Sequence, residues 1–329
     1  MAGSISVVIV AYNNGPALPR CLRSLEGEGA EVLVVNNGDP IPEPDGARLI
    51  APGRNLGFAA GCNLGAANAT GAVLVFLNPD TVVAPGALAE LARTLDDPAI
   101  GIAMPRLRLL DRPELLNSGG NVLHVTGLAW AGGFGERADR IAEVRDVTYP
   151  TGAAMAIRAE LFRELGGFTE ELFMYQEDLD LGWRVRLRGL RVVVTPGADV
   201  YHDYEYGRNP RKQYLLERNR LVFVLSAYSS RLLALLSPVL LANELAMLAV
   251  AGKEGWWRDK LAGWGWLVRH ARWLARHRRE TQRLRRVHDR DLAPLLSPVI
   301  DPAMIELPKR VGAANRLVEW YWSLARRAL

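Results

Sequence analysis

The first part of the chain alternates between short apolar runs and segments with apolar residues at helical spacing. Residues 6–12, 31–35 and 72–77 are almost wholly apolar and rich in valine, isoleucine and leucine. Such runs are typical of strands that are buried on both faces of a parallel sheet. Residues 16–26 and 58–69 lie between these runs and predict helices. This alternation predicts a doubly wound α/β sheet.

The same patterns predict further elements along the chain. Strands are expected at residues 48–50, 148–158 and 191–195, and helices at residues 85–95, 160–165 and 177–187. Residues 117–140 contain six glycines and no clear period, so they predict a mobile loop whose role is open.

Polar side chains follow three of the predicted strands directly. Asn13-Asn14 ends the first strand, Asn36-Asn37 ends the second, and Asn78-Pro79-Asp80 follows the strand at residues 72–77. In doubly wound sheets, ligands bind at the carboxyl ends of the strands. We therefore expect the functional site to lie where these three segments meet.

The charge is distributed unevenly along the 329 residues. The whole chain carries 40 basic and 36 acidic residues, or +4, but residues 252–329 alone carry 17 basic and 8 acidic residues, or +9. Seven of the nine tryptophans also lie in that segment. We interpret residues 1–220 as a catalytic domain and residues 221–329 as an apolar, then basic and Trp-rich, helical region. Such a region indicates contact with an anionic surface.

The C-terminal region begins with an apolar stretch. Its longest uncharged run, residues 232–243, has 12 residues and contains Pro238. A membrane span needs about 20 apolar residues, so a transmembrane helix is not expected. Farther on, apolar residues recur at three- and four-residue spacing over 257–274 with arginines on other faces, which predicts one basic amphipathic helix. This helix would either lie at a membrane interface or pack on the catalytic domain or on a second subunit. Its Trp and Leu stripe does not favour nucleic acid.

The N-terminus and the cysteines bear on the compartment. No basic residues precede the first apolar run, which ends in polar turn residues, so it reads as a strand rather than as a targeting signal. Cys21 and Cys62 are too few for a disulfide framework or a thiolate metal cluster. With 49% hydrophobic residues the chain has enough apolar side chains for a sizeable core. We expect a cytoplasmic protein.

Asp80 is the first candidate for chemistry. A carboxylate at the end of a buried strand is well placed to hold Mg²⁺ or Mn²⁺ against a diphosphate, because these cations prefer oxygen ligands. The alternative is that Asn78 and Asp80 only form an Asx turn or a helix cap.

Glu177, Asp178 and Asp180 form the densest acidic cluster of the chain. Carboxylates this close repel one another unless a cation is near or one of their pKa values is raised, and a raised pKa suits a general base. The alternative is that acidic residues favour the first turn of the helix at residues 177–187. That alternative explains less well why the cluster follows an apolar segment.

His202 and the basic residues after it are less specific. His202 could complete a metal site with Asp80, bind phosphate or be structural. The basic residues would contact phosphate or form a solvated face; they are Arg208, Arg211, Lys212, Arg218 and Arg220.

Two glycine-containing segments surround the start of the helix at residues 58–69. Asn55-Leu56-Gly57 and the segment around Asn63 would let backbone N–H groups approach an anion. Their glycine spacing is not that of a dinucleotide-binding loop, and no Walker A, HExxH, GxSxG or zinc-finger spacing occurs in the chain.

Taken in order, these motifs resemble those of the family-2 glycosyltransferases with a GT-A fold, especially the bacterial rhamnosyltransferase-like branch. The resemblance covers roughly residues 4–220 and rests on five motifs, SVVIVAYNN, EVLVVNNGD, RNLGFAAGCNLG, VFLNPDT and YPTGAAMAIRAELFRELGGFTEELFMYQEDLDLGWRVRLRG. It implies a GT-A-type doubly wound mixed sheet, to which the pattern of residues 221–329 adds a helical, amphipathic C-terminal extension.

The resemblance also implies roles for individual residues. Asp80 would hold Mg²⁺ or Mn²⁺ on the donor diphosphate, and His202 matches a position that is a metal ligand in some members. Asp178 of the Glu177-Asp178 pair would be the catalytic base of an inverting transfer. Gly152 lies in a segment beside the donor sugar and acceptor. Further residues would line the nucleotide pocket, among them Ala11, Tyr12, Asn13, Asn36, Asn55, Gly57, Asn63 and Asn78.

Asn36 is the one departure that matters for the donor. Many relatives have an Asp here, which accepts the N3–H of uracil or thymine. An Asn carbonyl can also accept N3–H, and its NH₂ can donate to O4. The expected donor is therefore a UDP- or dTDP-sugar, with dTDP-rhamnose as the first guess from the branch resemblance.

The expected acceptor is a saccharide, free or carried on a polyprenyl diphosphate at the cytoplasmic face of the membrane, in cell-envelope glycan synthesis. A homo-oligomer is a further possibility. Two other classes compete with this interpretation. A sugar-nucleotide pyrophosphorylase would need a Gly-rich, basic loop after the first strand, which Tyr12-Asn13-Asn14-Gly15 does not provide. An inactive sugar-nucleotide-binding or membrane-bound scaffold would not need Asp80 and Asp178.

Overall fold

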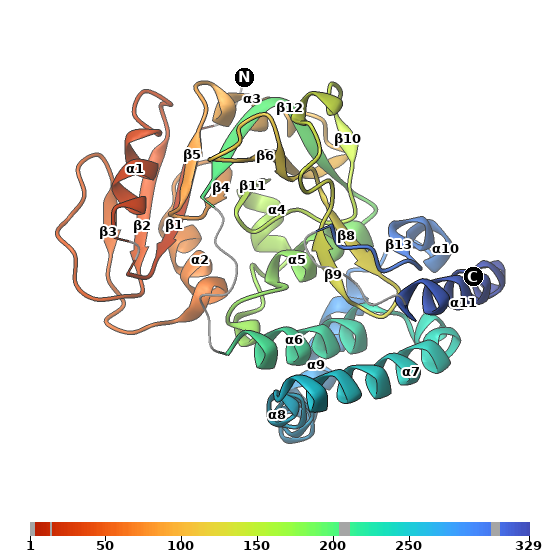
Figure 1. Ribbon diagram of the computed structural model, residues 1–329. Coiled ribbons are helices and arrows are strands. Elements are labelled where there is room, and N and C mark those ends of the chain that lie inside the picture. Colours follow the sequence, from red (N-terminus) through yellow and green to blue (C-terminus); the bar gives the residue numbers. More distant parts are fainter. Residues whose placement is uncertain (1–3, 14, 204–210, 304–309) are drawn as a thin grey trace. The chain divides into compact units, whose positions relative to one another are not determined.

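The structure is a computed structural model that describes residues 4–13, 15–203, 211–303 and 310–329 (Figure 1). The chain forms two compact units. Unit 1 comprises Met1–Asn121, Ala131–Val185 and Leu190–Glu205, and unit 2 comprises Val122–Trp130, Arg186–Gly189 and Tyr206–Leu329.

Unit 1 is built on a mixed sheet. Its main path runs β10-β12-β6-β11-β4-β1-β2-β3, with β5 paired to β12 and β7 paired to β6. The strands are β1 Ile5–Ala11, β2 Glu31–Asn36, β3 Arg48–Ile50, β4 Val73–Leu77, β5 Thr81–Val83, β6 Ile100–Leu109, β7 Leu116–Ser118, β10 Arg145–Asp146, β11 Ala154–Arg158 and β12 Arg191–His202.

The parallel half of this sheet confirms the pattern of apolar runs. β1 lies between β4 and β2 and is parallel to both, as is β3 to β2. The side chains from Val7 to Ala11 are buried on both faces of β1. Ala11 pairs with Asn36 and Ile9 pairs with Leu77, so the three strands end at one edge. The polar residues that follow them therefore gather there, as expected.

Short helices cover the sheet of unit 1. They are α1 Ala17–Arg23, α2 Gly57–Asn68, α3 Ala87–Thr94, α4 Ala159–Glu164 and α5 Glu177–Leu187, with 3₁₀ turns η1 Ala138–Arg140 and η2 Glu170–Leu172. α2 packs on β1 and β2, and α3 packs on β6 and β12. Val8 meets α2 at Gly65, where an added Cβ would lie 2.3 Å from Cγ1 of Val8, so the helix needs glycine at this approach.

Four expectations about strands need correction. The ten-residue strand β6 was not predicted, because Gly101 and Pro105 interrupt its apolar pattern. The glycine-rich segment 117–140 is not a mobile loop throughout but contains β8 Asn121–His124, β9 Ala129–Ala131 and the end of β7. Residues 148–153 precede β11 and are not part of it. β12 continues past Thr195 to His202 through an irregular register.

Unit 2 is mainly helical. Its helices are α6 Lys212–Ala227, α7 Ser230–Glu254, α8 Trp257–Arg269, α9 Ala271–Arg283, α10 Asp289–Leu292 and α11 Arg310–Ala325, with 3₁₀ turns η3 Ala293–Leu295 and η4 Arg326–Ala328. A small sheet, β13-β8-β9, includes β13 Leu296–Ser297. The amphipathic segment predicted as one helix is two, α8 and α9, because the helix ends at His270 (φ −107°, ψ 20°).

Helix α7 corrects a second expectation. It runs unbroken for 25 residues through Pro238, and by length and composition it could cross a membrane. The apolar helix is therefore longer than the 12-residue uncharged run predicted. Pro238 cannot donate to the carbonyl of Ala234, and the Ser237 hydroxyl donates to that oxygen instead. Length and composition alone are weak evidence that a helix spans a membrane, so the contacts of α7 must also be considered.

A buried charge network joins α6, α7 and α8. Arg220 forms ion pairs with Glu217 and Glu244, and Lys260 forms ion pairs with the same two carboxylates. The indole N–H of Trp264 donates to Glu244 over 3.0 Å. Arg220 and Lys260 are 1% exposed, so each cation depends on these carboxylates in place of water. The two positive and two negative charges balance, and the network fixes the three helices against one another.

Candidate active site

The loops after β1 and β2 are joined by side-chain hydrogen bonds. Asn13 has a positive φ of 52°, and its Oδ1 accepts the backbone N–H of Asp39 over 2.8 Å. A Cβ atom on Gly38 would lie 2.1 Å from this same oxygen, so only glycine fits there. Tyr12 is 56% exposed at the edge where these loops meet, while Ala11 is buried beneath it.

Asn36 is buried and braces its own loop. Its Nδ2 donates to the carbonyl of Asp39 over 2.8 Å, and its Oδ1 accepts the N–H of Gly38 over 3.1 Å. An amide oxygen has a second lone pair and an NH₂ group a second hydrogen. Asn36 therefore has the capacity to pair with a base in addition to shaping the loop.

The backbone N–H groups at the start of α2 are bonded within the chain. The carbonyl of Phe173 accepts the N–H groups of Phe58 and Ala59, and Oδ1 of Asn55 accepts that of Gly57. A Cβ atom on Gly57 would lie 2.6 Å from the carbonyl oxygen of Phe173. The structure thus gives Asn55 and Gly57 a local role, which is to let the segment before α5 reach the start of α2.

Asn63 and Asn37 also hold loops. Oδ1 of Asn63 accepts the N–H of Phe168 over 2.8 Å, and its Nδ2 donates to the carbonyl of the same residue over 2.9 Å. Nδ2 of Asn37 donates to the carbonyl of Gly57 over 2.8 Å. The contact of Asn63 keeps α2 beside Phe168, and the contact of Asn37 keeps the start of α2 beside the end of β2.

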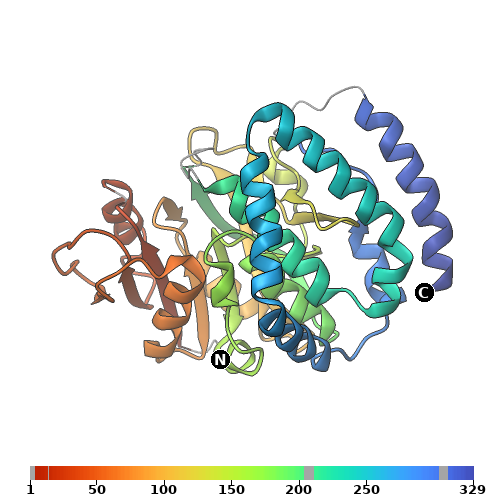
Figure 2. The same ribbon diagram turned by 90° about the horizontal axis from the view of Figure 1, so that it is seen from below.

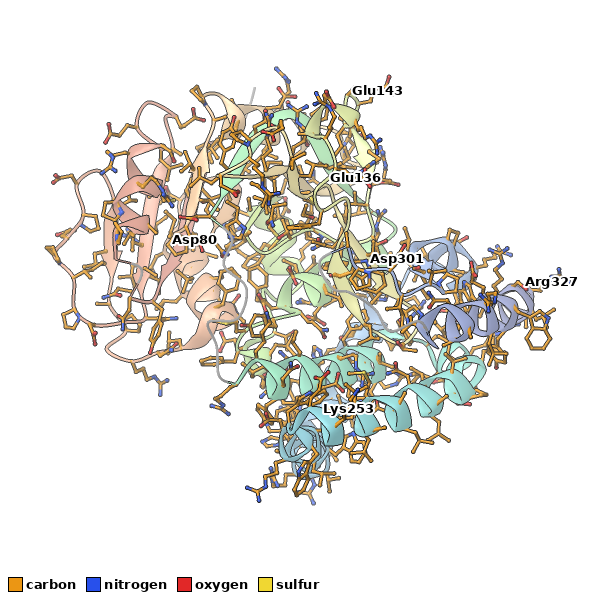
Figure 3. All side chains as sticks on the ribbon, viewed as in Figure 1. Asp80, Glu136, Glu143, Lys253, Asp301 and Arg327 are labelled. Carbon is orange, nitrogen blue, oxygen red and sulfur yellow. The ribbon has the colours of Figure 1, made fainter. Side chains whose placement is uncertain are left out.

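Asp80 and His202 lie together on paired strands. His202 at the end of β12 pairs with Thr81 of β5, and Nε2 of His202 is 3.3 Å from Oδ1 of Asp80 (Asp80 is labelled in Figure 3). The backbone N–H of Asp203 also donates to the carbonyl of Asp80 over 3.0 Å. The sequence separates these two residues by more than a hundred positions, and the pairing of β5 with β12 brings them together.

Asn117 defines the proton on His202. Its Oδ1 lies 3.0 Å from Nδ1 of His202 in a buried position. A carbonyl oxygen only accepts, so in the neutral imidazole the proton is on Nδ1 and a lone pair is on Nε2. In that neutral form the lone pair faces the carboxylate of Asp80, and a metal cation bound by both atoms would offset their repulsion, whereas a protonated imidazole would form an ion pair with Asp80. A histidine that donates its other N–H to a carbonyl is typical of metal ligands.

The donor set fits a hard divalent cation that also binds a substrate. No group of three or more His, Cys, Asp or Glu side chains gathers within the part of the chain that the structure describes. One carboxylate and one imidazole leave several positions for phosphate oxygens and water, which is how Mg²⁺ is usually held beside a diphosphate.

Asn117→Ala is expected to weaken Mn²⁺ binding by about 10- to 100-fold, because the imidazole of His202 loses the acceptor that fixes its tautomer. Titration of Mn²⁺ in the presence of a nucleoside diphosphate measures this affinity. Asn117→Asp keeps an oxygen acceptor and should bind more tightly than the Ala variant. Equal affinity of the Ala variant and the wild type would show that Asn117 has no part in the site.

Asp178 is held by backbone amides at the start of α5. The N–H of Gly152 donates to its Oδ2 over 2.8 Å, and the N–H of Leu179 donates to its Oδ1 over 2.7 Å. Next to Gly152, the carbonyl of Ala153 accepts the N–H of Asn78 over 2.9 Å. Residues 152–153 therefore connect the end of β4, two residues before Asp80, directly to Asp178.

The other two acidic residues of the cluster differ from Asp178. Asp180 is buried and accepts hydrogen bonds from Arg184 and from Thr169, so it has a structural role. Glu177 is 5% exposed, and its Oε2 makes no hydrogen bond within the described residues. A Cβ atom on Gly152 would lie 3.5 Å from Oε1 of Glu177 and 3.4 Å from Oδ2 of Asp178. A larger residue at position 152 would cover both carboxyl groups.

The two neighbouring carboxyl groups have raised pKa values. Burial raises the pKa of Asp178 to about 6, although the backbone N–H groups that it accepts act in the opposite direction. Burial, and then the charge of Asp178, raise the pKa of Glu177 well above its usual value. This favours a negative charge on Asp178 over one on Glu177, and the charged group is the one able to take a proton.

The segment before α5 is conformationally unusual. Phe173, Tyr175 and Gln176 all have positive φ, and Phe173 (φ 65°, ψ −61°) has the dihedrals of a γ-turn. Non-glycine residues adopt such conformations at a cost, and they cluster at functional sites. Here the strained segment leads directly into Glu177 and Asp178.

The catalytic rate is expected to increase as pH rises through about 6, because Asp178 must be deprotonated to act as a base.

The free energy of unfolding should fall over the same pH range in which the catalytic rate rises. An aspartate in the unfolded chain has a pKa of about 3.9, so between about pH 4 and 6 the folded state binds the proton more tightly and the free energy of unfolding falls as pH rises. Transfer rates and urea unfolding over this range measure both slopes. Loss of the rate inflection in a form of the enzyme that lacks this carboxylate is the control.

The basic residues after β12 make different contacts from one another. Arg220 belongs to the buried charge network, and the guanidinium of Arg218 lies over the rings of Tyr214 and Trp266. Arg211 lies over Tyr214. All three, with Lys212, belong to unit 2, and Arg208 lies outside the described residues.

The sequence did not point to Asn117 as a site residue, because the segment that contains it was predicted to be a loop.

Comparison with known proteins agrees with this fold. Residues 6–166 match the family model for Glycosyl transferase family 2. The solved structure of GalNAc-T7 with UDP, GalNAc and Mn²⁺ superposes with a TM-score of 0.57 at 19% identity, covering 71% of this chain and 50% of that one. The chain thus spans half the length of that structure, and the likeness concerns the fold. The sequence match and the fold together support a family-2 glycosyltransferase with a GT-A fold, as the motifs implied.

Two curated relatives come from Mycobacterium tuberculosis. N-acetylglucosaminyl-diphospho-decaprenol L-rhamnosyltransferase is 29% identical over 247 residues, covering 64% of this chain and 80% of the relative. Pre-mycofactocin glycosyltransferase is 31% identical over 208 residues, covering 61% of this chain and 43% of the relative. The two relatives differ in the product that their names indicate.

Proposed function

We propose that this glycosyltransferase is an inverting, divalent-metal-dependent enzyme. It would move a sugar, with L-rhamnose as the first candidate, from a pyrimidine nucleoside diphosphate to a saccharide or lipid-linked saccharide acceptor in cell-envelope glycan synthesis. The observation that carries the proposal is the short connection from Asp178 through residues 152–153 to Asn78, beside Asp80. It joins a basic carboxylate to the residues suited to hold a metal diphosphate.

In this mechanism the chain positions two reactants and moves one proton. Asp178 would accept the proton of an acceptor hydroxyl while that oxygen forms a bond to the anomeric carbon. The bond from this carbon to the diphosphate breaks on the opposite face, which gives inversion. Asp80 and His202 would hold Mg²⁺ or Mn²⁺, and such an ion would supply positive charge to the departing diphosphate. Holding both substrates in line supplies much of the rate enhancement.

The donor and acceptor assignments rest on different evidence. The loops that contain Asn13 and Asn36 carry one exposed and one buried amide group, and amides are suited to a pyrimidine edge, which favours UDP- or dTDP-sugars. The name of the rhamnosyltransferase relative supports rhamnose and a polyprenyl-diphosphate-linked acceptor. The apolar and basic surface of unit 2 supports a peripheral location on the cytoplasmic face of the membrane. Assembly as a homo-oligomer is compatible with this location.

The deciding experiment is nucleoside diphosphate release from a panel of sugar nucleotides, with and without acceptor. We expect release from one dTDP- or UDP-sugar that requires Mn²⁺ or Mg²⁺ and stops on chelation. The anomeric configuration of the product, read from its NMR coupling constants, tests inversion. Binding of a donor by calorimetry with no turnover of any acceptor would favour the scaffold instead. Preferred binding of GDP-sugars would overturn the pyrimidine assignment.

A further inference from the structure

The outer face of α7 is an exposed apolar stripe. It comprises Pro238, Leu241, Ala242, Leu245, Ala249 and Val250, which recur at three- and four-residue spacing. Leu241 and Leu245 are 63% and 61% exposed. Only 6% of the most apolar window of this helix is buried within the chain. A soluble protein rarely leaves a stripe of this length in contact with water, so it marks an interaction surface.

The inner face of α7 is already used. Glu244 lies on that face and binds Arg220 of α6 and Lys260 of α8. A helix held by charged groups on one side cannot have lipid all around it, so α7 is suited to lie on a bilayer and not to cross it. Figure 2 shows α11 running beside α7, and the hydroxyl of Tyr321 donates to the carbonyl of Leu235. On α11, Leu317 and Trp320 are also exposed, at 64% and 61%.

Helix α9 of the same unit presents an arginine face. Its inner side packs on α6, where Arg278 and Gln282 donate to backbone carbonyls at the end of that helix. Its outer side carries Arg272, Arg276, Arg279 and Arg283 at three- and four-residue spacing, all exposed. None of these four forms an ion pair with any residue that the structure describes, although Glu280 lies on the same helix. Four unpaired guanidinium groups on one helix face favour an anionic partner.

We infer that the apolar stripe of α7 and the arginine face of α9 together dock unit 2 on an anionic lipid bilayer. The stripe would enter the boundary between headgroups and acyl chains, while the arginines bind lipid phosphates. Charge complementarity favours an anionic bilayer over a second copy of the chain, because a second copy would bring its own arginines to the interface. The inference rests on the membrane-associated function proposed above and names the surface of unit 2 that would contact the membrane.

Flotation of the full chain with vesicles tests this surface. Binding is expected to vesicles that contain phosphatidylglycerol, to be weak on phosphatidylcholine alone, and to be released by alkaline carbonate. Leu241→Glu with Leu245→Glu, and separately Arg272→Gln with Arg276→Gln and Arg279→Gln, should each weaken binding by about 100-fold. The matched controls in unit 1 are Val144→Glu for the apolar change and Arg23→Gln with Arg112→Gln and Arg163→Gln for the charge change, and they should bind as the wild type does.

Two outcomes would overturn the inference, and activity measurements separate it from the proposed function. Retention in the vesicles after carbonate treatment would make α7 a true span. Sedimentation that changes from oligomer to monomer in the Leu variant, with flotation unchanged, would make the stripe a contact between copies. Nucleoside diphosphate release in solution should be the same in all these variants. Flotation without transferase activity in the wild type would contradict the proposed enzyme and leave the docking surface in place.

Discussion

Replacing Asp178 with Asn is expected to lower the rate of sugar transfer by about 10²- to 10⁴-fold, the range that a positioned general base contributes. The reason is geometric as well as electrostatic. Gly152 and Leu179 donate to the two oxygens of Asp178, and burial raises its pKa to about 6, so it is charged at neutral pH and strong enough to take a proton. An amide at this position cannot accept that proton. Single-turnover transfer with saturating donor and metal measures the loss.

The variant should still bind donor and metal, because Asp80 and His202 are untouched. Calorimetry with a nucleoside diphosphate and Mn²⁺, and a melting temperature near that of the wild type, would show that only chemistry is lost. Asp111→Asn makes the same chemical change at an exposed carboxylate and should leave the rate unchanged. Transfer by the Asp178 variant within a factor of three or so of the wild type would assign the base elsewhere, with Glu177 the nearest carboxyl group.

Replacing Lys260 with Met should cost about 3 to 5 kcal/mol of stability, the range for breaking a buried ion pair on one side. Lys260 is 1% exposed and binds both Glu217 and Glu244. Without it, the buried carboxylate of Glu217 and the partly buried one of Glu244 share only Arg220, and one negative charge is uncompensated. Urea unfolding, followed by tryptophan fluorescence from the Trp-rich unit 2, measures the change.

A second substitution separates charge balance from packing. Lys260→Met with Glu217→Gln leaves one positive and one negative charge in the network and should recover a large part of the lost stability. Lys253→Met, at the exposed end of α7 (labelled in Figure 3), is the matched control and should be close to neutral. If the double variant were less stable than the single one, the network would act through specific geometry and not through charge balance.

Much of the fold could be predicted because its signals are local. The apolar runs that become β1, β2 and β4 are buried on both faces and contain no glycine or proline, so period and composition agree. Helix α5 begins and ends where the sequence predicted, since acidic residues fill its first turn. β6 was missed for the opposite reason. Its Gly101 and Pro105 disfavour a strand locally, and its pairing with β11 and β12 overrides that preference.

The sequence by itself determined the types of groups at the candidate site. It placed Asp80 after a buried strand and Asp178 at the start of a helix, since strand ends and helix starts are local properties of the chain. Tertiary structure alone decided which of these groups meet. His202 reaches Asp80 only because β12 pairs with β5, Asn117 reaches His202 from a segment taken as a loop, and Asp178 rather than Asp180 faces Gly152. It also decided that Glu244 faces the buried Lys260 while Leu241 is exposed, because long-range packing, which local sequence does not encode, chooses the face of each helix.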